Sequence, residues 1–189
     1  MSTLIIRGRA LSFRTKPESI NDNNSYNYIE DAAIIIKDGK ILNIGNYSEV
    51  KSFEKNITNI IDHRPHLILP GFIDPHLHFP QIQVIGSYAS NLLEWLKEYT
   101  FIEEQKFCNL DHSNIVAKKF FDELINNGTT TAASFCTSHI ESVESFFTES
   151  NRRNMLMIGG KVMMDRNAPK ELLDTAQKSY DETKYLIKK

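Results

Sequence analysis

The pattern of hydrophobic and polar positions changes near residue 66 of this 189-residue chain. Before that point, short runs of β-branched residues predict strands at 3–11, 31–39 and 40–47. Asp38-Gly39, between the last two runs, is a strong signal for a hairpin turn. The polar segment 14–30 between the first two runs predicts an exposed loop. We therefore expect residues 1–66 to form β-sandwich strands.

After residue 66, apolar runs alternate with amphipathic stretches. The apolar runs predict buried strands at 129–136 and 154–164, and a first strand within 66–78, where Pro70-Gly71 interrupts the run. The amphipathic stretches predict helices at 111–128, 140–151 and 169–189, and residues 91–101 read as a helical or looped segment. This order implies an α/β fold with a parallel sheet and right-handed crossovers.

Signals for helix ends sharpen two of these predictions. Asp111 or Ser113 can cap the start of helix 111–128, and Gly128 can close its end. Pro169 suits the first turn of the last helix.

Composition narrows the classes of partner. Lys plus Arg total 22 against 24 Asp plus Glu, a net charge of −2, so no basic surface is available for nucleic acid or anionic lipid. The first 13 residues hold too short an apolar stretch for a signal peptide, and no later run approaches a membrane span, which makes the cytoplasm the expected location. Cys108 and Cys136 form no CxxC pair, and we expect both to pack as small apolar side chains.

Two histidines one residue apart stand at the end of the run at 66–78. On a strand, His76 and His78 point to the same face and can share one metal ion. Asp74, two residues earlier, is placed to orient one imidazole. The spacing alone is weak evidence, and a catalytic zinc needs at least three protein ligands. The pair nevertheless follows the first strand of a βα series, where barrel enzymes carry their chemistry.

Several segments around this pair resemble the guanine deaminase family of the amidohydrolase superfamily. They are PGFIDPHLHFPQ, LLEWLKEYTF, FFDELINNGTTTA and ESFFTESNRRNMLMIGGKVMMDRNAP, in the family's order. The resemblance implies a (β/α)8 barrel of the TIM type, preceded by strands of a composite β-sandwich domain at 1–66. Residues 67–189 suffice for about three βα units, so the barrel is incomplete in this chain.

The resemblance also implies a reaction: zinc-dependent hydrolysis of guanine to xanthine and ammonia. His76 and His78 match the first two zinc ligands, and His78, Phe79, Pro80 and Gln81 match residues that hold the base. The family takes its remaining ligands, its proton-shuttling Glu and an Arg from later strands, so no catalytic residue is expected here and the chain alone should be inactive. Guanine and water are the implied small-molecule partners, with a homodimer possible at full length.

Other candidate residues have simpler explanations. We expect solvated side chains for His63, His66, His112 and His139, although His139 lies on the catalytic rim. For Trp95, Tyr99 and Phe101, packing is at least as good an explanation as contact with a flat base. Lys161, mid-strand, favours an ion pair inside the barrel.

Two alternatives to guanine deamination stay open. Another amidohydrolase would act on an s-triazine, adenosine-like or imidazolone ring, and Gln81 would then matter little to its preferred substrate. A truncated remnant without catalysis would serve only as a structural or interaction domain.

Overall fold

The computed structural model describes residues 3–53 and 59–189, and the chain divides into two compact units, Met1–Pro70 and Gly71–Lys189. Residues 1–2 and 54–58 of the predicted β domain lie outside the described residues. The division falls at Pro70-Gly71, whereas the pattern of hydrophobic positions changes near residue 66.

The first unit is built on a four-stranded sheet with the order β3-β2-β1-β4. Its elements are β1 (Thr3–Phe13), β2 (Tyr26–Lys37), β3 (Lys40–Asn46), the helix α1 (Tyr47–Phe53) and β4 (Ile60–Ile68). β2 pairs antiparallel with both β1 and β3, and β4 pairs parallel with β1. Ile5, Ala33, Ile35 and Val50 form its small core.

The predicted hairpin between β2 and β3 is confirmed. Asp38 and Gly39 both have positive φ angles, 52° and 75°, and Lys37 pairs with Lys40 across the turn. A two-residue turn with both central residues in the left-handed region matches the twist of the strands that it joins.

Two predicted boundaries in this half were wrong. β2 begins at Tyr26, inside the predicted loop, because the alternating Tyr26 and Tyr28 pair with Phe13 and Leu11 of β1. The apolar run at 66–78 is not one strand, since β4 ends at Ile68 in the first unit and β5 (Phe72–His78) belongs to the second.

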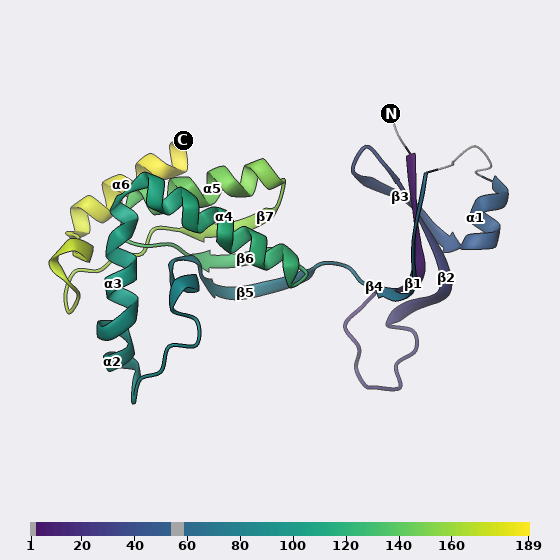
Figure 1. The fold of residues 1–189 in the computed structure, drawn as a ribbon, viewed down its shortest axis with the longest axis horizontal. Coiled ribbons are helices and arrows are strands. Elements are labelled where there is room, and N and C mark those ends of the chain that lie inside the picture. The colour runs from purple at the N-terminus through teal and green to yellow at the C-terminus, as the bar shows by residue number, and fades with distance from the viewer. Residues whose placement is uncertain (1–2, 54–58) are drawn as a thin grey trace. The chain divides into compact units, whose positions relative to one another are not determined.

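The second unit contains a three-stranded parallel sheet with the order β5-β6-β7, as the alternating pattern predicted. β6 spans Thr129–Phe135 and β7 spans Leu156–Gly160. Helices α4 (Leu110–Asn126) and α5 (Ile140–Arg153) lie along one face of this sheet (Figure 1). Their apolar stripes bury a core that includes Phe79, Phe107, Phe120, Phe121 and Phe146.

The segment between β5 and α4 is mostly helical. It comprises η1 (Phe79–Val84), α2 (Leu92–Trp95), η2 (Leu96–Thr100), α3 (Phe101–Glu104) and η3 (Gln105–Cys108). After β7 come η4 (Lys170–Leu172) and α6 (Ala176–Lys188). None of the helices within residues 3–53 and 59–189 is both long enough and apolar enough to cross a membrane.

The predicted helix starts are corrected by their caps. α4 is capped by Asn109, whose side chain accepts a hydrogen bond from the His112 N–H at 3.0 Å, and not by Asp111 or Ser113. The last helix starts at Ala176 with Thr175 as its cap, so Pro169 only precedes the short η4. Gly128, with a φ of 80°, does follow the end of α4 as predicted.

Candidate metal and substrate site

The histidine pair lies at the carboxyl end of β5, the first strand of the parallel sheet. The register shifts between Asp74 and Leu77, where three steps along β5 face two steps along β6. Such a bulge re-aims side chains and is frequent next to active sites. Leu77 packs against the helix-covered core, whereas His76 is exposed and His78 half-buried.

The two imidazoles are close enough to share one ion. Their ring centroids lie 5.2 Å apart with an interplanar angle of 73°. Two imidazoles bound to one zinc at a tetrahedral angle, with Zn–N bonds of about 2.0 Å, have centroids about 5 Å apart. Phe135 of β6 packs beside both rings, with its centroid 5.7 Å from His76 and 5.0 Å from His78. The centroid distance therefore allows the two imidazoles to share one metal ion.

A third ligand is lacking in the part of the chain that the structure describes. No group of three or more His, Cys, Asp or Glu side chains there could hold a metal ion. Asp74 does not orient an imidazole as expected, because its Oδ1 accepts a hydrogen bond from the backbone N–H of His76 at 3.0 Å. This carboxylate instead fixes the backbone at the bulge.

Burial keeps His78 suited to bind a metal. Partial burial, and to a smaller extent the neighbouring His76, lower the pKa of His78 below its ordinary value. A lowered pKa favours the neutral imidazole, which is the form that coordinates metals.

The residues after the histidine pair form the short helix η1. Some of their side chains are buried in the core, and others line a cavity. The Phe79 side chain is fully buried in the core, and its backbone N–H donates to Ser134 Oγ at 3.0 Å. Pro80 is also buried. Gln81 lies with His76 and His78 on the wall of an open cavity of about 580 Å³. Of the residues matched to base binding, His78 and Gln81 thus share this cavity, and the Phe79 ring points into the core.

Gln81 connects the histidine pair to a carboxyl group that the sequence analysis missed. Its Nε2 lies 3.3 Å from Nδ1 of His78 and donates to Oε1 of Glu104 at 3.2 Å. Glu104 is only 5% exposed. Burial raises the pKa of Glu104, and the hydrogen bond from Gln81 partly offsets that increase.

Glu104 lies on the buried face of its helical segment. Thr100, Glu104 and Phe107 recur at spacings of four and three, and all three are buried. This is the spacing of one helix face, so the carboxyl group occupies a core-facing position.

The remaining histidines do not join this site. His63 and His66 are exposed on β4 of the first unit. The expectation of solvated rings was wrong for the other two, because the Nε2 atoms of His112 and His139 are buried without a hydrogen-bond partner. The His112 ring packs edge-on against Phe107, with centroids 5.1 Å apart.

Lys161 forms an ion pair, as expected, but it follows β7 and its partners lie on and just before α6, not inside a barrel. Its buried Nζ contacts Asp174 Oδ2 and lies 3.3 Å from Glu182 Oε2. Both carboxylates come from α6 and the residues just before it, so the ion pair ties α6 to the end of β7.

The cysteines and aromatic residues complete the comparison with expectation. Cys136 is buried, and burial raises its thiol pKa to about 12, whereas Cys108 is exposed, against expectation. Trp95 lines the histidine cavity, and its Nε1 donates to the Ser87 carbonyl at 3.2 Å. Tyr99 and Phe101 do not line that cavity.

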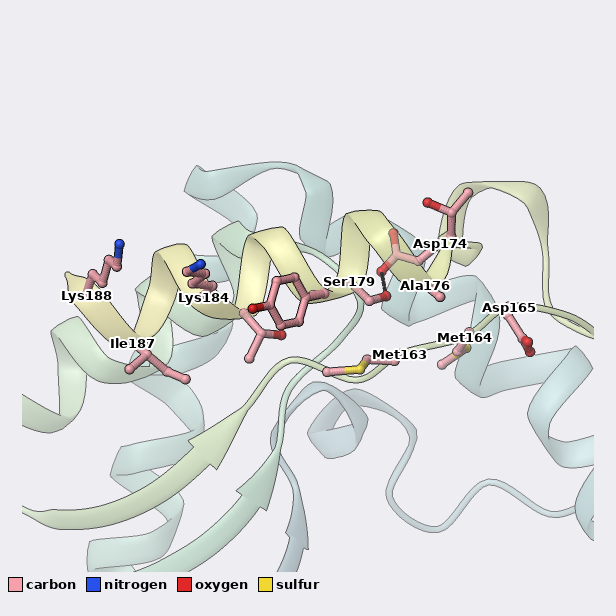
Figure 2. A pocket seen from close by; sticks show the side chains of 12 residues that line it. Met163, Met164, Asp165, Asp174, Ala176, Ser179, Lys184, Ile187 and Lys188 are labelled. Carbon is pink, nitrogen blue, oxygen red and sulfur yellow. Dashed lines mark hydrogen bonds between the residues drawn. The ribbon is translucent and has the colours of Figure 1, made fainter.

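Two further cavities lie along α6, away from the histidine pair. One, of about 580 Å³, runs between α6 and the segment after β7, and Met163, Ser179 and Ile187 contribute side chains to it (Figure 2). Ser179 Oγ donates there to Asp174 at 3.1 Å. The other, of about 870 Å³, adjoins Leu110, Phe147 and Leu186. Neither has a histidine on its wall, so the chemistry is expected at the β5 cavity.

A parallel βα series with an HxH pair after its first strand is typical of metal-dependent hydrolases, and the comparisons with known proteins agree. The model of the amidohydrolase family matches residues 67–189, and the chain belongs to this family. The predicted fold, the first part of an amidohydrolase barrel preceded by β strands, is thereby confirmed.

Within the family, the chain is similar to guanine deaminases. It is 42% identical over 173 residues to guanine deaminase of Escherichia coli, covering 92% of this chain and 39% of that protein. It superposes on the guanine deaminase structure from Bradyrhizobium japonicum with a TM-score of 0.92 and 34% identity, over 100% of this chain and 41% of that one. The guanine deaminase structure from C. acetobutylicum, which has guanine bound in its active site, superposes with a TM-score of 0.82 and 31% identity. The match covers 98% of this chain and 42% of that one. The chain thus spans about two fifths of the length of these relatives.

Proposed function

We propose that this chain is the part of a guanine deaminase that supplies two zinc ligands and a base-holding amide. The observation that carries the proposal is the cavity at the end of β5, where two imidazoles with centroids 5.2 Å apart adjoin the Gln81 carboxamide. Similarity to guanine deaminases over nearly the whole chain, including one with guanine bound, supports the substrate.

The roles of the residues follow from their chemistry. When bound, zinc would lower the pKa of a water molecule to about 7 and so provide hydroxide for attack on the ring carbon bearing the amino group. His76 and His78 would hold the ion, and the Asp74 contact with the His76 backbone would fix their strand. Gln81 would hold the purine through its amide, while the buried Phe79 anchors the turn that carries Gln81.

Completion of the reaction requires groups beyond those described. The pair of histidines needs at least one more protein ligand, and the leaving ammonia needs a proton donor. We propose that the part of the protein corresponding to the rest of the relatives' length supplies both. The 189-residue chain alone should then show no turnover.

A joined protein tests the proposal. It fuses this chain to the part of the E. coli guanine deaminase that follows the segment similar to it. We expect it to release ammonia from guanine, to form xanthine and to contain one zinc per active site by elemental analysis. No activity on guanine, together with turnover of an s-triazine, an adenosine-like substrate or an imidazolone, would contradict the substrate assignment.

A substitution at Gln81 tests whether the substrate is guanine or one of the alternative ring systems. Gln81→Ala in the joined protein should lower kcat/KM for guanine about tenfold, the size of one lost hydrogen bond to a polar ligand. Gln83→Ala is the matched control, because Gln83 is exposed and lies two residues further along η1. An unchanged kcat/KM in Gln81→Ala would favour another ring system.

A further inference from the structure

The contact between Gln81 and Glu104 joins η1 to α3. The nitrogen of the Gln81 carboxamide donates a hydrogen bond to Oε1 of Glu104 at 3.2 Å and lies 3.3 Å from Nδ1 of His78. A carboxylate can only accept hydrogen bonds, so it holds the nitrogen end of the amide toward itself. The amide would otherwise turn freely about its last side-chain bond.

Glu104 is buried without a compensating cation. It is 5% exposed, and within residues 3–53 and 59–189 no Lys, Arg or His forms an ion pair with it. Burying a carboxyl group with a single hydrogen bond costs free energy, and such groups gather at functional sites. Its hydrogen bond goes to the residue that faces the proposed substrate.

We propose that Glu104 is a positioning residue that fixes the Gln81 carboxamide, leaving the Gln81 carbonyl oxygen as the acceptor for an N–H group of the purine. The inference rests on the proposed function. The inference extends the proposed function by assigning a role to Glu104. It also assigns a direction to the hydrogen bond between Gln81 and the substrate, in which the substrate must be the donor. No described group donates to that carbonyl oxygen.

The same two helices contain a matched comparison. Gln83 donates to Oε2 of Glu103 at 2.7 Å, which repeats the pairing of a glutamine on η1 with a glutamate on α3. Gln83 is exposed and does not line the histidine cavity. The Gln83–Glu103 pair therefore has the same chemistry as the Gln81–Glu104 pair but lies outside the histidine cavity.

The test compares Glu104→Leu and Glu104→Gln in the joined protein. Leu keeps about the same packing volume and removes the hydrogen-bond acceptor. KM for guanine should then rise about tenfold while kcat changes less than threefold. The reason is that the lost contact holds the base in the ground state and the transition state alike. Gln keeps an acceptor oxygen and should restore KM to within about threefold of wild type. Glu103→Leu, the matched control, should leave both constants unchanged.

A spectroscopic measurement on the 189-residue chain is independent of turnover. The side-chain NH2 resonances of Gln81 in a ¹⁵N-edited NMR spectrum should shift in Glu104→Leu and stay in place in Glu103→Leu. Unchanged Gln81 resonances, or an unchanged KM in an active Glu104→Leu enzyme, would overturn the positioning role. A wild-type joined protein without guanine turnover would overturn the proposed function instead, and the NMR comparison would still decide whether Glu104 holds Gln81.

Discussion

At the scale of single residues, the site joins two kinds of environment. His76 is exposed, whereas His78 is half-buried beside Phe135 and Gln81. One side chain can thus reach a metal ion from the solvent side, while the other is held by its neighbours. This difference in burial should appear in the pKa of His78.

The titration of His78 tests this difference. Burial and His76 both lower the pKa of His78, with burial the larger cause. Histidine NMR on the metal-free chain should place this pKa below 6.5. His76→Gln removes the repulsion by a second cation and should raise the pKa of His78, though not to the ordinary value, because the ring remains buried. An equal or lower pKa in His76→Gln would contradict the assigned cause.

The residues of the site differ in how far the sequence could predict them. The positions of His76, His78 and Gln81 near one cavity follow from their short separation, which local geometry fixes. Glu104 is 23 residues from Gln81, and its contact depends on how α3 packs against η1. The residue types around position 104 predict neither its burial nor the polar group that it meets in the core.

At the scale of elements, the close approach of β7 to α5 depends on a glycine. A Cβ atom at Gly159 would lie 2.6 Å from Cε1 of Phe146, whose ring is fully buried. Gly160, the next residue of the same strand, has nothing within 4 Å of the corresponding position. The two glycines thus make a matched pair.

We predict that Gly159→Ala destabilises the protein by about 1–3 kcal/mol, because overpacking forces the Phe146 ring from its place. Gly160→Ala should stay within about 0.5 kcal/mol of wild type. Urea unfolding followed by circular dichroism measures both. Equal midpoints for the two variants would contradict the packing of α5 against β7.

The C-terminal turns of α5 contain a charge cluster with a definite pH dependence. Glu149 contacts Arg152 and Arg153, both at 2.6 Å, and its side chain is 12% exposed. The hydrogen bond from Arg152, followed by that from Arg153, lowers the pKa of Glu149 from 4.5 to about 2. Because the folded pKa is depressed, the stabilisation is present above about pH 4.5 and is lost as pH falls toward 2.

Glu149→Gln should therefore lower the free energy of unfolding by about 0.5–1 kcal/mol at pH 7. The difference from wild type should shrink progressively below pH 4.5. Glu123→Gln, at an exposed position on α4, is the control and should change little at either pH. A difference that grows on acidification would contradict the pairing.

The elements themselves were largely predictable, and the exceptions have local causes. The long amphipathic stripes gave α4 and α5, since their buried residues recur at helical spacing. The predicted run at 66–78 joined the last residues of β4 to β5 across Pro70-Gly71, although β4 pairs with β1 and β5 with β6. Residues 60–65 of β4 were not predicted as a strand, because polar residues interrupt their apolar pattern. Caps such as Asn109 depend on where the first helical turn begins.

At the scale of the whole molecule, the parallel sheet is incomplete. β5 and β7 are its outer strands, and Ile73, Leu156 and Ile158 are each more than two thirds exposed. Exposed apolar side chains beside unpaired strand edges favour association between chains. The same surface would be covered if further βα units extended the sheet.

We predict that the 189-residue chain self-associates in a concentration-dependent way. Ile158→Lys should reduce the association seen by sedimentation velocity, because a charge on the open sheet face resists burial. Ile20→Lys is the control, since Ile20 is 97% exposed in a loop of the first unit. A monomer at all concentrations, or equal effects of the two variants, would contradict an association through the sheet.

The zinc dependence of guanine turnover tests the proposed site most directly. The joined protein should release ammonia from guanine, lose activity when a chelator removes zinc, and regain it when zinc is returned. His76→Ala combined with His78→Ala should lower kcat/KM by more than about 100-fold and abolish zinc binding. Unimpaired turnover in that double variant would show that the two histidines at the end of β5 do not hold the metal.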